Sequence, residues 1–249
     1  MSKKESRSSK RQLIREQRQR RERQKRLALI LGISAVALVV VALLVIPNIL
    51  AASAPVGEIK VITPVARPTA DGLALGDPNA PVTVEVFEDF QCPMCDQYSQ
   101  QIEPQIVQND VATGKVHYIF RQYPFLDTGK PGQESHKAAN ASMCANEQGR
   151  FWDYHDMLFA NWNGENEGNF SDKRLIAFAE ALNLDMNQFR QCYNENRYQA
   201  EIQADLERGK QLGVTGTPSV FVNEQIVAPG YVPTYDQIQA AIQAAQPSQ

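Results

Sequence analysis

The sequence predicts an α/β fold in which a block of helices interrupts a sheet-forming domain, with one N-terminal transmembrane helix in front of it. Residues 82–120 show the pattern of a strand, a helix and a second strand. A helical stretch follows over about residues 131–212, and two short strands and a helix close the chain. Ahead of all these elements, residues 27–46 form an uncharged apolar run.

Residues 1–26 form a strongly basic arm. They hold 12 Lys/Arg against 3 Glu, a balance of +9, whereas the remainder holds 13 Lys/Arg against 25 Asp/Glu, a balance of −12. The arm contains no aromatic side chain that could stack on a nucleobase. We therefore interpret it as a cytoplasmic arm that sets membrane topology and contacts anionic lipid, and not as a nucleic-acid site.

The apolar run from Leu27 to Ile46 has 20 residues and no charge. As a helix it would span roughly 30 Å, the thickness of one hydrocarbon core. Because basic residues stay on the cytoplasmic side, we expect residues 27–47 to be the signal anchor of a single-pass cell-membrane protein with its body outside the cytoplasm. A cleaved signal peptide is the alternative, since small residues follow at 51–54.

The segment 48–71 is expected to be an extended linker. It carries Pro55, Pro64 and Pro68 among small and polar residues. Glu58–Ile62 alternates weakly between polar and apolar residues and is a candidate edge strand. The globular domain then occupies residues 72–249.

The first half of the domain predicts a βαβ unit. Val82–Phe87 alternates as a strand, a helix is expected from Cys92 to about Val111, and Lys115–Phe120 is apolar and aromatic enough for the interior of a sheet. Two strands joined through a helix favour parallel pairing.

Five helices are predicted in the middle of the chain: Glu134–Glu147, Phe151–Asn161, Asp172–Leu182, Met186–Asn194 and Arg197–Leu212. Gly149 and Gly213 suit positions just after a helix, whereas Ser171 and Asp185 suit N-caps. Phe151–Phe159 is rich in aromatic residues and is expected to pack in the core.

The last third predicts a hairpin of Pro218–Asn223 and Gln225–Ala228, followed by the helix Tyr235–Ala245. Without the helical block, the order is βαβ followed by ββα. That is the order of the thioredoxin fold, here with a helical domain inserted at about residues 131–212.

The motif Cys92-Pro93-Met94-Cys95 lies where the first strand gives way to a helix. Unpaired N–H groups at a helix start stabilise a thiolate, so Cys92 is predicted to be the exposed nucleophile. Cys95 lies one turn further, more buried, and is predicted to resolve the mixed disulfide. Pro93 falls near the first helical position, where its missing N–H costs little.

Half of a zinc site is the alternative interpretation of this motif, but zinc needs further ligands. The three histidines, His117, His136 and His155, show no paired ligand spacing. His136 and His155 fall on predicted helices and are expected to lie at the surface or as satisfied core residues. We therefore predict no metal and no organic cofactor beyond the redox-active pair itself.

The chain has four cysteines, all after the apolar run, and an even count allows three pairings. The short spacing makes Cys92 and Cys95 the natural close pair, which leaves Cys144 and Cys192 for each other. In an oxidising compartment we expect these two to form a structural disulfide within the helical block.

Three segments in this order resemble the DsbA-like thiol–disulfide oxidoreductases, and more closely their membrane-anchored bacterial branch. They are Val84–Cys95, Phe151–Phe159 and Gly213–Asn223, and the resemblance extends over about residues 71–245. It implies a cis-proline at Pro218 that faces the cysteine motif. It also implies that a substrate strand hydrogen-bonds to the backbone at Thr217.

One departure from this family concerns an acid. Relatives often carry a buried acid six residues before the first cysteine, where it assists proton transfer, and this chain has Val86 there. Glu85, Glu88 and Asp89 are nearby and are interpreted as solvated or edge charges, with helix capping as an alternative for Asp89. A direct carboxylate relay to Cys95 is therefore in doubt.

Met94 is a second departure, since the best-known oxidases of the family have a histidine at this position. Met94 offers no hydrogen-bond donor to a thiolate. We therefore expect the helix to lower the pKa of Cys92, but less than in the strongest oxidants.

These observations predict a membrane-tethered thiol–disulfide oxidoreductase that forms disulfides in cysteine pairs of exported proteins. The resemblance implies a quinone-linked membrane reoxidase as partner. Two alternatives stay open: a reductase or isomerase that uses the same site, and a non-catalytic, membrane-tethered chaperone.

Overall fold

The computed structural model describes residues 20, 21, 23, 26, 31–34, 36–46, 56–127 and 133–247. The chain divides into two compact units, residues 1–55 and residues 56–249.

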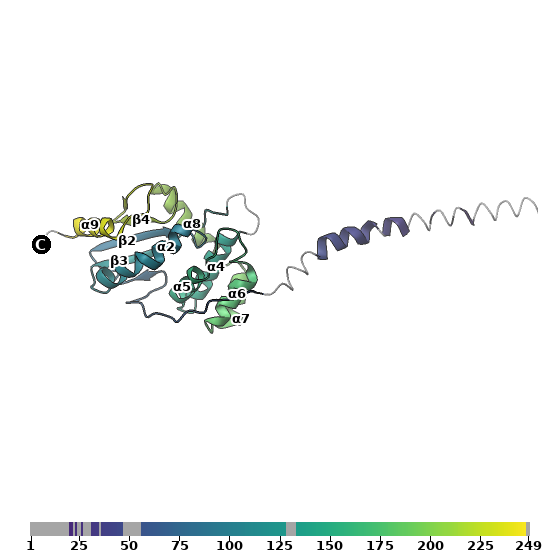
Figure 1. The fold of residues 1–249 in the computed structure, drawn as a ribbon, viewed down its shortest axis with the longest axis horizontal. Coiled ribbons are helices and arrows are strands. Elements are labelled where there is room, and N and C mark those ends of the chain that lie inside the picture. The colour runs from purple at the N-terminus through teal and green to yellow at the C-terminus, as the bar shows by residue number, and fades with distance from the viewer. Residues whose placement is uncertain are drawn as a thin grey trace, which may run out of the picture. The chain divides into compact units, whose positions relative to one another are not determined.

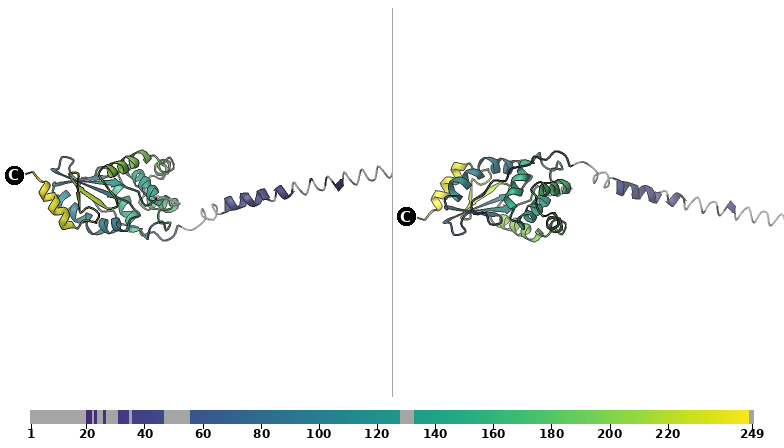
Figure 2. Two further views of the ribbon diagram at one scale, coloured as in Figure 1. Left: turned by 90° about the horizontal axis from the view of Figure 1, so that it is seen from above. Right: turned by 90° about the horizontal axis from the view of Figure 1, so that it is seen from below.

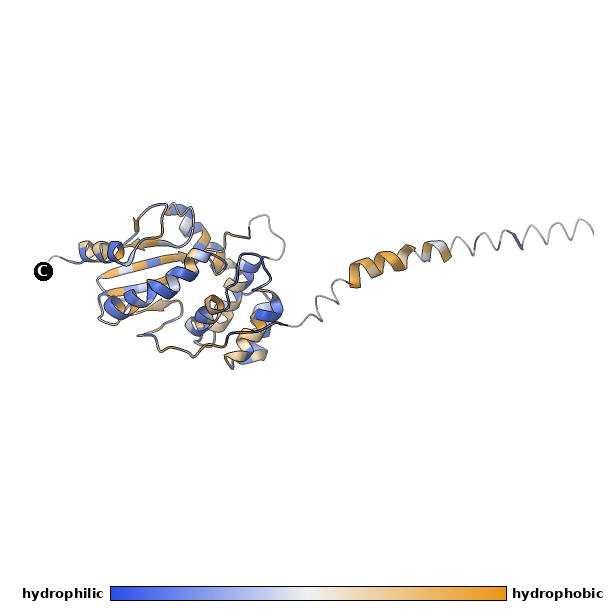
Figure 3. Ribbon diagram, in the orientation of Figure 1, coloured by the Kyte–Doolittle hydropathy of each residue, from blue (hydrophilic) through white to orange (hydrophobic). Residues whose placement is uncertain are grey.

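The described part of the first unit is helical over residues 31–34 and 36–46. Its leucines and valines are mostly exposed, and Figure 3 shows this helical segment as predominantly hydrophobic. Among the residues that the structure describes, no helix combines the length and hydropathy needed to cross a membrane. The predicted anchor also includes residues 27–30, 35 and 47, which lie outside the described residues.

The second unit is built on a sheet whose described strands are ordered β1-β3-β2-β4-β5 (Figure 1). The strands are β1 (Ala74–Leu75), β2 (Val82–Glu88), β3 (Val116–Gln122), β4 (Ser219–Val222) and β5 (Gln225–Val227). The strands β2 and β3 pair in parallel, as the βαβ pattern predicts, and the other pairs are antiparallel. The fold is therefore thioredoxin-like, with the helical block between its halves.

Alternate residues of β2 face opposite sides of the sheet. Val84 and Val86 join the larger core, together with the helices α2 (Pro93–Gln101) and α9 (Tyr235–Ala245). Phe87 joins a smaller core on the other side. Since β2 is covered on both faces, its end, which leads into the cysteine motif, is held from both sides.

The helices α4, α5, α6 and α7 gather at one end of the sheet, away from α9, in all three views of Figures 1 and 2. They span Glu134–Asn146, Phe151–Ala160, Asp172–Ala181 and Met186–Asn194. As expected, the aromatic residues of α5 are buried core residues. Asp185 caps α7 through its carboxylate, whereas the Ser171 side chain makes no capping hydrogen bond within the described residues.

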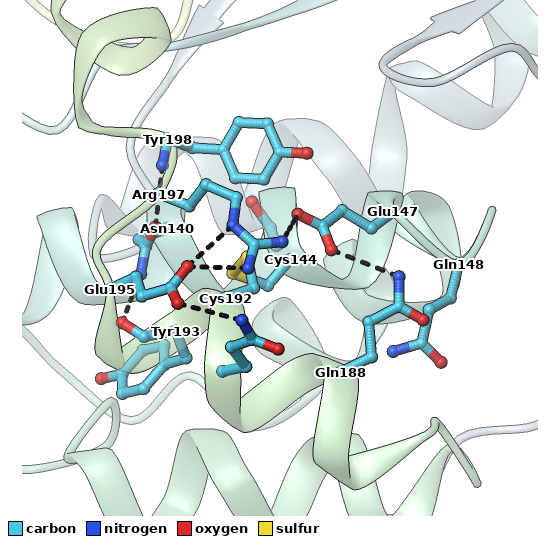
Figure 4. Close-up of a disulfide and its surroundings, with 12 residues drawn as sticks. Asn140, Cys144, Glu147, Gln148, Gln188, Cys192, Tyr193, Glu195, Arg197 and Tyr198 are labelled. Atoms are coloured by element: carbon cyan, nitrogen blue, oxygen red, sulfur yellow. Dashed lines mark hydrogen bonds and ion pairs between the residues drawn. A yellow bond between two sulfur atoms is a disulfide. The ribbon is translucent and has the colours of Figure 1, made fainter.

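A disulfide joins Cys144 of α4 to Cys192 of α7, with their Cα atoms 5.7 Å apart. Both cysteines are fully buried. Figure 4 shows an ion-pair network beside this disulfide, in which Arg197 contacts Glu147 at 2.7 Å and Glu195 at 2.8 Å. The disulfide and the network tie the end of α7 to the end of α4.

The helix α8 (Gln199–Gln211) departs from the prediction that it belongs to the inserted block. It packs on the second face of the sheet, where Leu206 joins the smaller core. Gly209 permits this approach, because a Cβ atom there would lie 2.5 Å from the Tyr123 ring. The inserted block proper therefore ends before α8. Its predicted start at Pro131 lies outside the described residues.

The single helix predicted for residues 92–111 is also wrong. It divides into α2, α3 (Glu103–Ile106) and a π-helical turn, η1 (Val107–Val111). The break lies next to Pro104, which cannot donate the N–H that would continue the hydrogen-bond ladder to residue 100.

Residues 56–71, assigned from the sequence to the linker, belong to the second unit. Arg174 donates to the carbonyls of Val56 and Glu58 at 2.9 and 3.1 Å. The Lys60 backbone exchanges two hydrogen bonds with the Asn161 side chain. Glu58–Ile62 forms no strand within this described segment; side chains of the body bind the backbone of Glu58 and Lys60 instead.

Candidate redox site

Cys92 occupies the N-cap of α2, and Pro93 follows at the start of the helix. The Cys92 carbonyl accepts hydrogen bonds from the backbone N–H groups of Cys95 and Asp96, both at 3.1 Å. The helix thus begins at the cysteine motif, and the Cys92 sulfur lies where the partial positive charge of the helix is greatest.

The two cysteines of the motif are present as thiols and differ in burial. Cys92 retains 6% of its surface, and Cys95 retains none. The expectation of an exposed Cys92 is therefore wrong in degree, because the loop around Thr217 covers much of it. Cys92 is still the member of the pair that solvent or a substrate can reach.

The loop before β4 faces Cys92. It contains a cis peptide bond between Thr217 and Pro218, at the position where the sequence predicted one. The Cys92 thiol donates to the Thr217 carbonyl at 3.2 Å. The Thr217 hydroxyl is buried and has no hydrogen-bond partner among the described residues, so it is available to donate to a thiolate.

The pKa values of the two thiols shift in opposite directions. The pKa of Cys92 falls from 9.0 to about 6, chiefly because the Cys95 thiol donates a hydrogen bond to its sulfur. Burial opposes this shift, whereas hydrogen bonds from Thr217 and from the backbone N–H groups of Cys95 and Met94 reinforce it. Burial raises the pKa of Cys95 well above its ordinary value. Near neutral pH the pair therefore holds one thiolate, on Cys92, beside one thiol.

Gln91, which precedes the motif, fixes the active-site loop to the helical block. Its side chain donates to Asp127 at 3.1 Å and to Ser135 at 2.8 Å. Its carbonyl accepts from the Trp162 indole at 2.7 Å. No signal in the sequence indicated this role, because the partners lie 36 to 71 residues away along the chain.

The acidic residues before the motif are buried, so their interpretation as solvated or edge charges is wrong. Glu85 lies between Arg121 and Arg208 on the face of the sheet covered by α8. Asp89 accepts from the backbone N–H groups of Gln91 and Leu126 and thereby holds the turn before α2. Burial raises the pKa of Asp89 to about 6.

Glu88 is fully buried, and burial raises its pKa well above the ordinary value, reinforced by the charges of Glu103 and Cys92. It lies two residues after Val86 and so on the same face of β2. Cys95 is among the groups that affect its pKa. A buried acid is thus present near the resolving cysteine, and the period of two along the strand was the signal that could have revealed it.

Glu88, Glu103 and His155 form the one group in the described residues whose oxygen and nitrogen atoms could together hold a metal ion. One ligand atom from each lies within 4.8 Å of the others, and all three residues are buried. Arg67 pairs with Glu103 and with Asp156 at the border of this group.

A groove of about 260 Å³ lies beside the cysteine motif. Met94, Thr217, Pro218 and Tyr231 are among its lining residues. Met94 is 40% exposed and Tyr231 is 82% exposed. The groove thus offers a surface of both polar and apolar groups next to the reachable sulfur.

A cysteine pair at the start of α2, opposite a cis-proline loop on this sheet, is the arrangement of thioredoxin-fold proteins. A family model described as thioredoxin matches residues 69–244, and the chain belongs to this family.

Curated relatives include two kinds of protein. The Na(+)/H(+) antiporter NhaA 3 of Salinispora tropica is 36% identical over 59% of this chain, but over only 21% of the antiporter. The probable disulfide bond formation protein D of Bacillus anthracis is 27% identical over 64% of this chain and 72% of that protein. The chain thus spans about a fifth of the length of the antiporter it matches.

Solved structures with the same fold include BdbD from Bacillus subtilis, with a TM-score of 0.62 and 24% identity over 72% of this chain and 95% of that chain. The α-DsbA1 protein of Wolbachia pipientis matches with a TM-score of 0.57 and 25% identity, covering 70% of this chain and 89% of that chain. The chain is therefore similar to DsbA-like proteins over its second unit.

Proposed function

We propose that this protein is a thiol–disulfide oxidoreductase that forms disulfides in cysteine pairs of exported proteins. The observation that carries the proposal is the unequal pair of thiols: one reachable sulfur with a pKa near 6, and one buried sulfur with a raised pKa. The names of the relatives that are disulfide bond formation proteins support the same activity.

In the proposed reaction, the protein starts with a Cys92–Cys95 disulfide. A substrate thiolate attacks the Cys92 sulfur, and Cys95 leaves as a thiolate and takes up a proton. A second substrate thiolate then attacks the substrate sulfur of this mixed disulfide, and Cys92 leaves as a thiolate. The substrate has lost two electrons to form its disulfide, and the protein has gained them as a thiolate and a thiol.

The low pKa of Cys92 favours this direction, because a stable thiolate is a good leaving group. A pKa near 6 lies between that of thioredoxin, about 7, and that of the strongest oxidants, about 3.5. We therefore expect a reduction potential between those of the two classes. The groove formed by Met94, Thr217, Pro218 and Tyr231 would receive apolar residues that flank a substrate cysteine.

The test is oxidation of a reduced, unfolded dithiol protein by the oxidised wild type, followed by mass spectrometry. We expect Cys92→Ser to abolish disulfide transfer. Cys95→Ala cannot form the oxidised pair, so it is mixed instead with a protein that already carries a disulfide; attack of the Cys92 thiolate on that disulfide should accumulate a mixed disulfide on Cys92 and release the other substrate sulfur as a thiolate. Full transfer by Cys92→Ser would exclude the redox mechanism and favour the chaperone alternative. A potential as low as that of thioredoxin, measured against glutathione, would favour the reductase or isomerase alternative.

We also propose that residues 27–47 anchor the protein in the cell membrane with the catalytic domain outside the cytoplasm. The 20-residue uncharged run and the basic arm before it support this topology. A membrane reoxidase would then return the reduced pair to a disulfide. The full-length chain should stay with the membrane fraction after alkaline extraction, and a variant that lacks residues 1–55 should be soluble. Recovery of the full-length chain in the soluble fraction would contradict the anchor.

A further inference from the structure

The residues behind the redox site have many unpartnered polar atoms. Both carboxylate oxygens of Glu88, the Oε2 atom of Glu103 and the Nε2 atom of His155 are buried without a hydrogen-bond partner in the described structure. Each residue is fully buried, and they come from β2, α3 and α5. A buried polar group without a partner costs about 1–3 kcal/mol, so four such atoms that face one another need an explanation.

The tautomer of His155 is determined by its other nitrogen. Its Nδ1 atom lies 2.9 Å from Asp156 Oδ1. The same oxygen accepts a hydrogen bond from the Arg67 guanidinium, so it acts as an acceptor. Nδ1 therefore carries the hydrogen, and Nε2 presents a lone pair toward the other members of the group. Histidines that bind metals are commonly oriented in this way by a carboxylate.

Two lone pairs meet within this group. The Nε2 atom of His155 and the Oε2 atom of Glu103 are 3.5 Å apart. Two ligands of one tetrahedral zinc ion lie about 3.4 Å apart, given metal–ligand distances of about 2.0–2.1 Å. This pair thus already has the separation that a shared cation requires, and Glu88 lies within 4.8 Å to complete a set of three.

The local charges do not balance. Glu88, Glu103 and Asp156 bring three negative charges when they are ionised, and Arg67 brings one positive charge through its contacts with Glu103 and Asp156. With Glu88 ionised, two negative charges would remain in a buried space, where an uncompensated charge is costly. A divalent cation would neutralise them.

We propose that Glu88, Glu103 and His155 bind a divalent transition-metal cation of the zinc class in the core behind the redox motif. One imidazole with two carboxylates suits zinc and leaves a fourth position for water, whereas magnesium and calcium prefer oxygen ligands alone. Asp156 is a positioning residue that orients His155. The proposed ligands do not include the two cysteines, and the proposal does not depend on the proposed oxidoreductase activity.

A polar approach to the site exists. Arg67 and Asp156 line a cavity of about 940 Å³ that also borders α2. The same two side chains contact Glu103 and His155 directly. An ion in this cavity would thus be one side chain away from the proposed ligands.

The test must separate this site from the redox cysteines, which can themselves bind zinc as thiolates. We would therefore use the full-length Cys92→Ser/Cys95→Ser variant and titrate it with Zn²⁺ and, as a spectroscopic probe, Co²⁺. We expect one ion per chain, a cobalt spectrum of nitrogen and oxygen ligands, and a rise in melting temperature. Excess Ca²⁺ or Mg²⁺ should not displace the ion.

In the same background, Glu88→Gln and His155→Gln should each weaken Zn²⁺ binding by more than tenfold, and Asp156→Ala by about tenfold or more. Glu165→Gln and His117→Gln, which change the same residue types outside the group, should bind as the parent does. If His155→Gln does not fold, the loss of the zinc-induced rise in melting temperature in Glu88→Gln still tests the site.

Two results would overturn the proposal. One is the absence of saturable Zn²⁺ binding, together with a Glu88→Gln variant that is more stable than its parent at neutral pH. Protons, and not a metal ion, would then neutralise the buried carboxylates. The other is binding that Glu88→Gln and His155→Gln both retain, which would place the ion elsewhere. Either result would leave the dithiol chemistry of the wild type unaffected.

Discussion

At the scale of single residues, the chemistry depends on the difference between Cys92 and Cys95. They are three positions apart in the sequence, but only Cys92 lies at the helix start, and only Cys95 is fully buried. The thiolate is the reactive form of cysteine. The asymmetry therefore assigns the nucleophile to Cys92 without any contribution from a histidine, which Met94 replaces.

Titration of the reduced protein should show one thiolate with a midpoint near pH 6, because the Cys95 thiol and the helix N–H groups stabilise it. Ultraviolet absorbance of the thiolate measures this midpoint, and the transition should vanish in Cys92→Ser. A midpoint near that of an ordinary thiol, about 8.5, would contradict the geometry described here.

The same shift predicts a dependence of stability on pH. Between about pH 6 and 9 the folded reduced protein binds fewer protons at Cys92 than the unfolded chain does. The contribution of the Cys92 thiolate to the unfolding free energy is therefore fully present above the unfolded pKa and is lost as the pH falls through about 6. Relative to Cys92→Ser, the unfolding free energy of the reduced wild type should rise by about 1.4 kcal/mol per pH unit within this range.

Urea titrations of both reduced proteins at several pH values measure this difference. The comparison with the variant removes most of the opposite contribution of Cys95, whose pKa is raised by burial. A difference that is constant with pH would show that Cys92 is a thiol in the folded protein.

At the scale of elements, α8 is the helix whose place the sequence pattern did not reveal. Most of its 13 residues are polar. It packs closely on the sheet at Gly209, which lies against the rings of Tyr123 and Phe87. A glycine within a helix usually lowers its stability, by about 1 kcal/mol relative to alanine. Here the glycine is required by the close approach of α8 to the sheet.

Gly209→Ala should therefore destabilise the protein by about 1–3 kcal/mol, although alanine is the better helix former. The added Cβ would lie 2.5 Å from Tyr123 Cε2 and 3.1 Å from Phe87 Cδ1. Chemical denaturation measures the loss, with Gln203→Ala on an exposed position of the same helix as the control. A more stable Gly209→Ala variant would mean that α8 can move away from the sheet at little cost.

The disulfide between α4 and α7 should also contribute to stability. It closes a loop of 48 residues, for which the chain-entropy model gives about 4 kcal/mol. Cys144→Ala/Cys192→Ala should lower the melting temperature, as measured by calorimetry. Because the pair lies in the inserted block, we expect the Cys92 titration to stay unchanged; a shifted Cys92 midpoint would show coupling between the block and the redox site.

At the scale of the whole molecule, residues 56–71 are part of the folded body. Arg67 enters the core with a side chain that is only 12% exposed and pairs with Glu103, which is fully buried. The start of the compact unit at Val56 thus depends on the ion pairs of Arg67 with Glu103 and Asp156 and on the bonds of Arg174 and Asn161 to the backbone.

Arg67→Ala should cost about 3–5 kcal/mol, because it leaves the buried Glu103 carboxylate without its counter-ion. Arg190→Ala is the matched control, since its pair with Glu180 is exposed and such pairs contribute about 0–1 kcal/mol. Equal effects in urea denaturation would show that residues 56–71 do not stabilise the body.

The sequence by itself determined the order of the elements from β2 onward, the position of the cysteine motif at a helix start and the residues that form the disulfide. These features depend on local patterns: alternation within β2, helical spacing in the block, and the Pro93 and Gly213 signals at helix ends. The two-residue strand β1 was not predicted. The helix break next to Pro104 also has a local signal, the proline itself, but the helical pattern of residues 92–111 continues on both sides of it.

Only the tertiary structure decided which charges are buried. Glu85, Glu88 and Asp89 are neighbours in one strand end, yet the first is paired with arginines, the second has no partner among the described residues, and the third holds a turn. Apart from the Gln91 N–H, which is two residues from Asp89, the named partners of Glu85 and Asp89 lie 36 to 123 residues away. The period of two along β2 could place Glu88 on the same face as Val86. Which partners each acid meets depends on contacts between distant segments, and no local pattern in the sequence encodes those contacts.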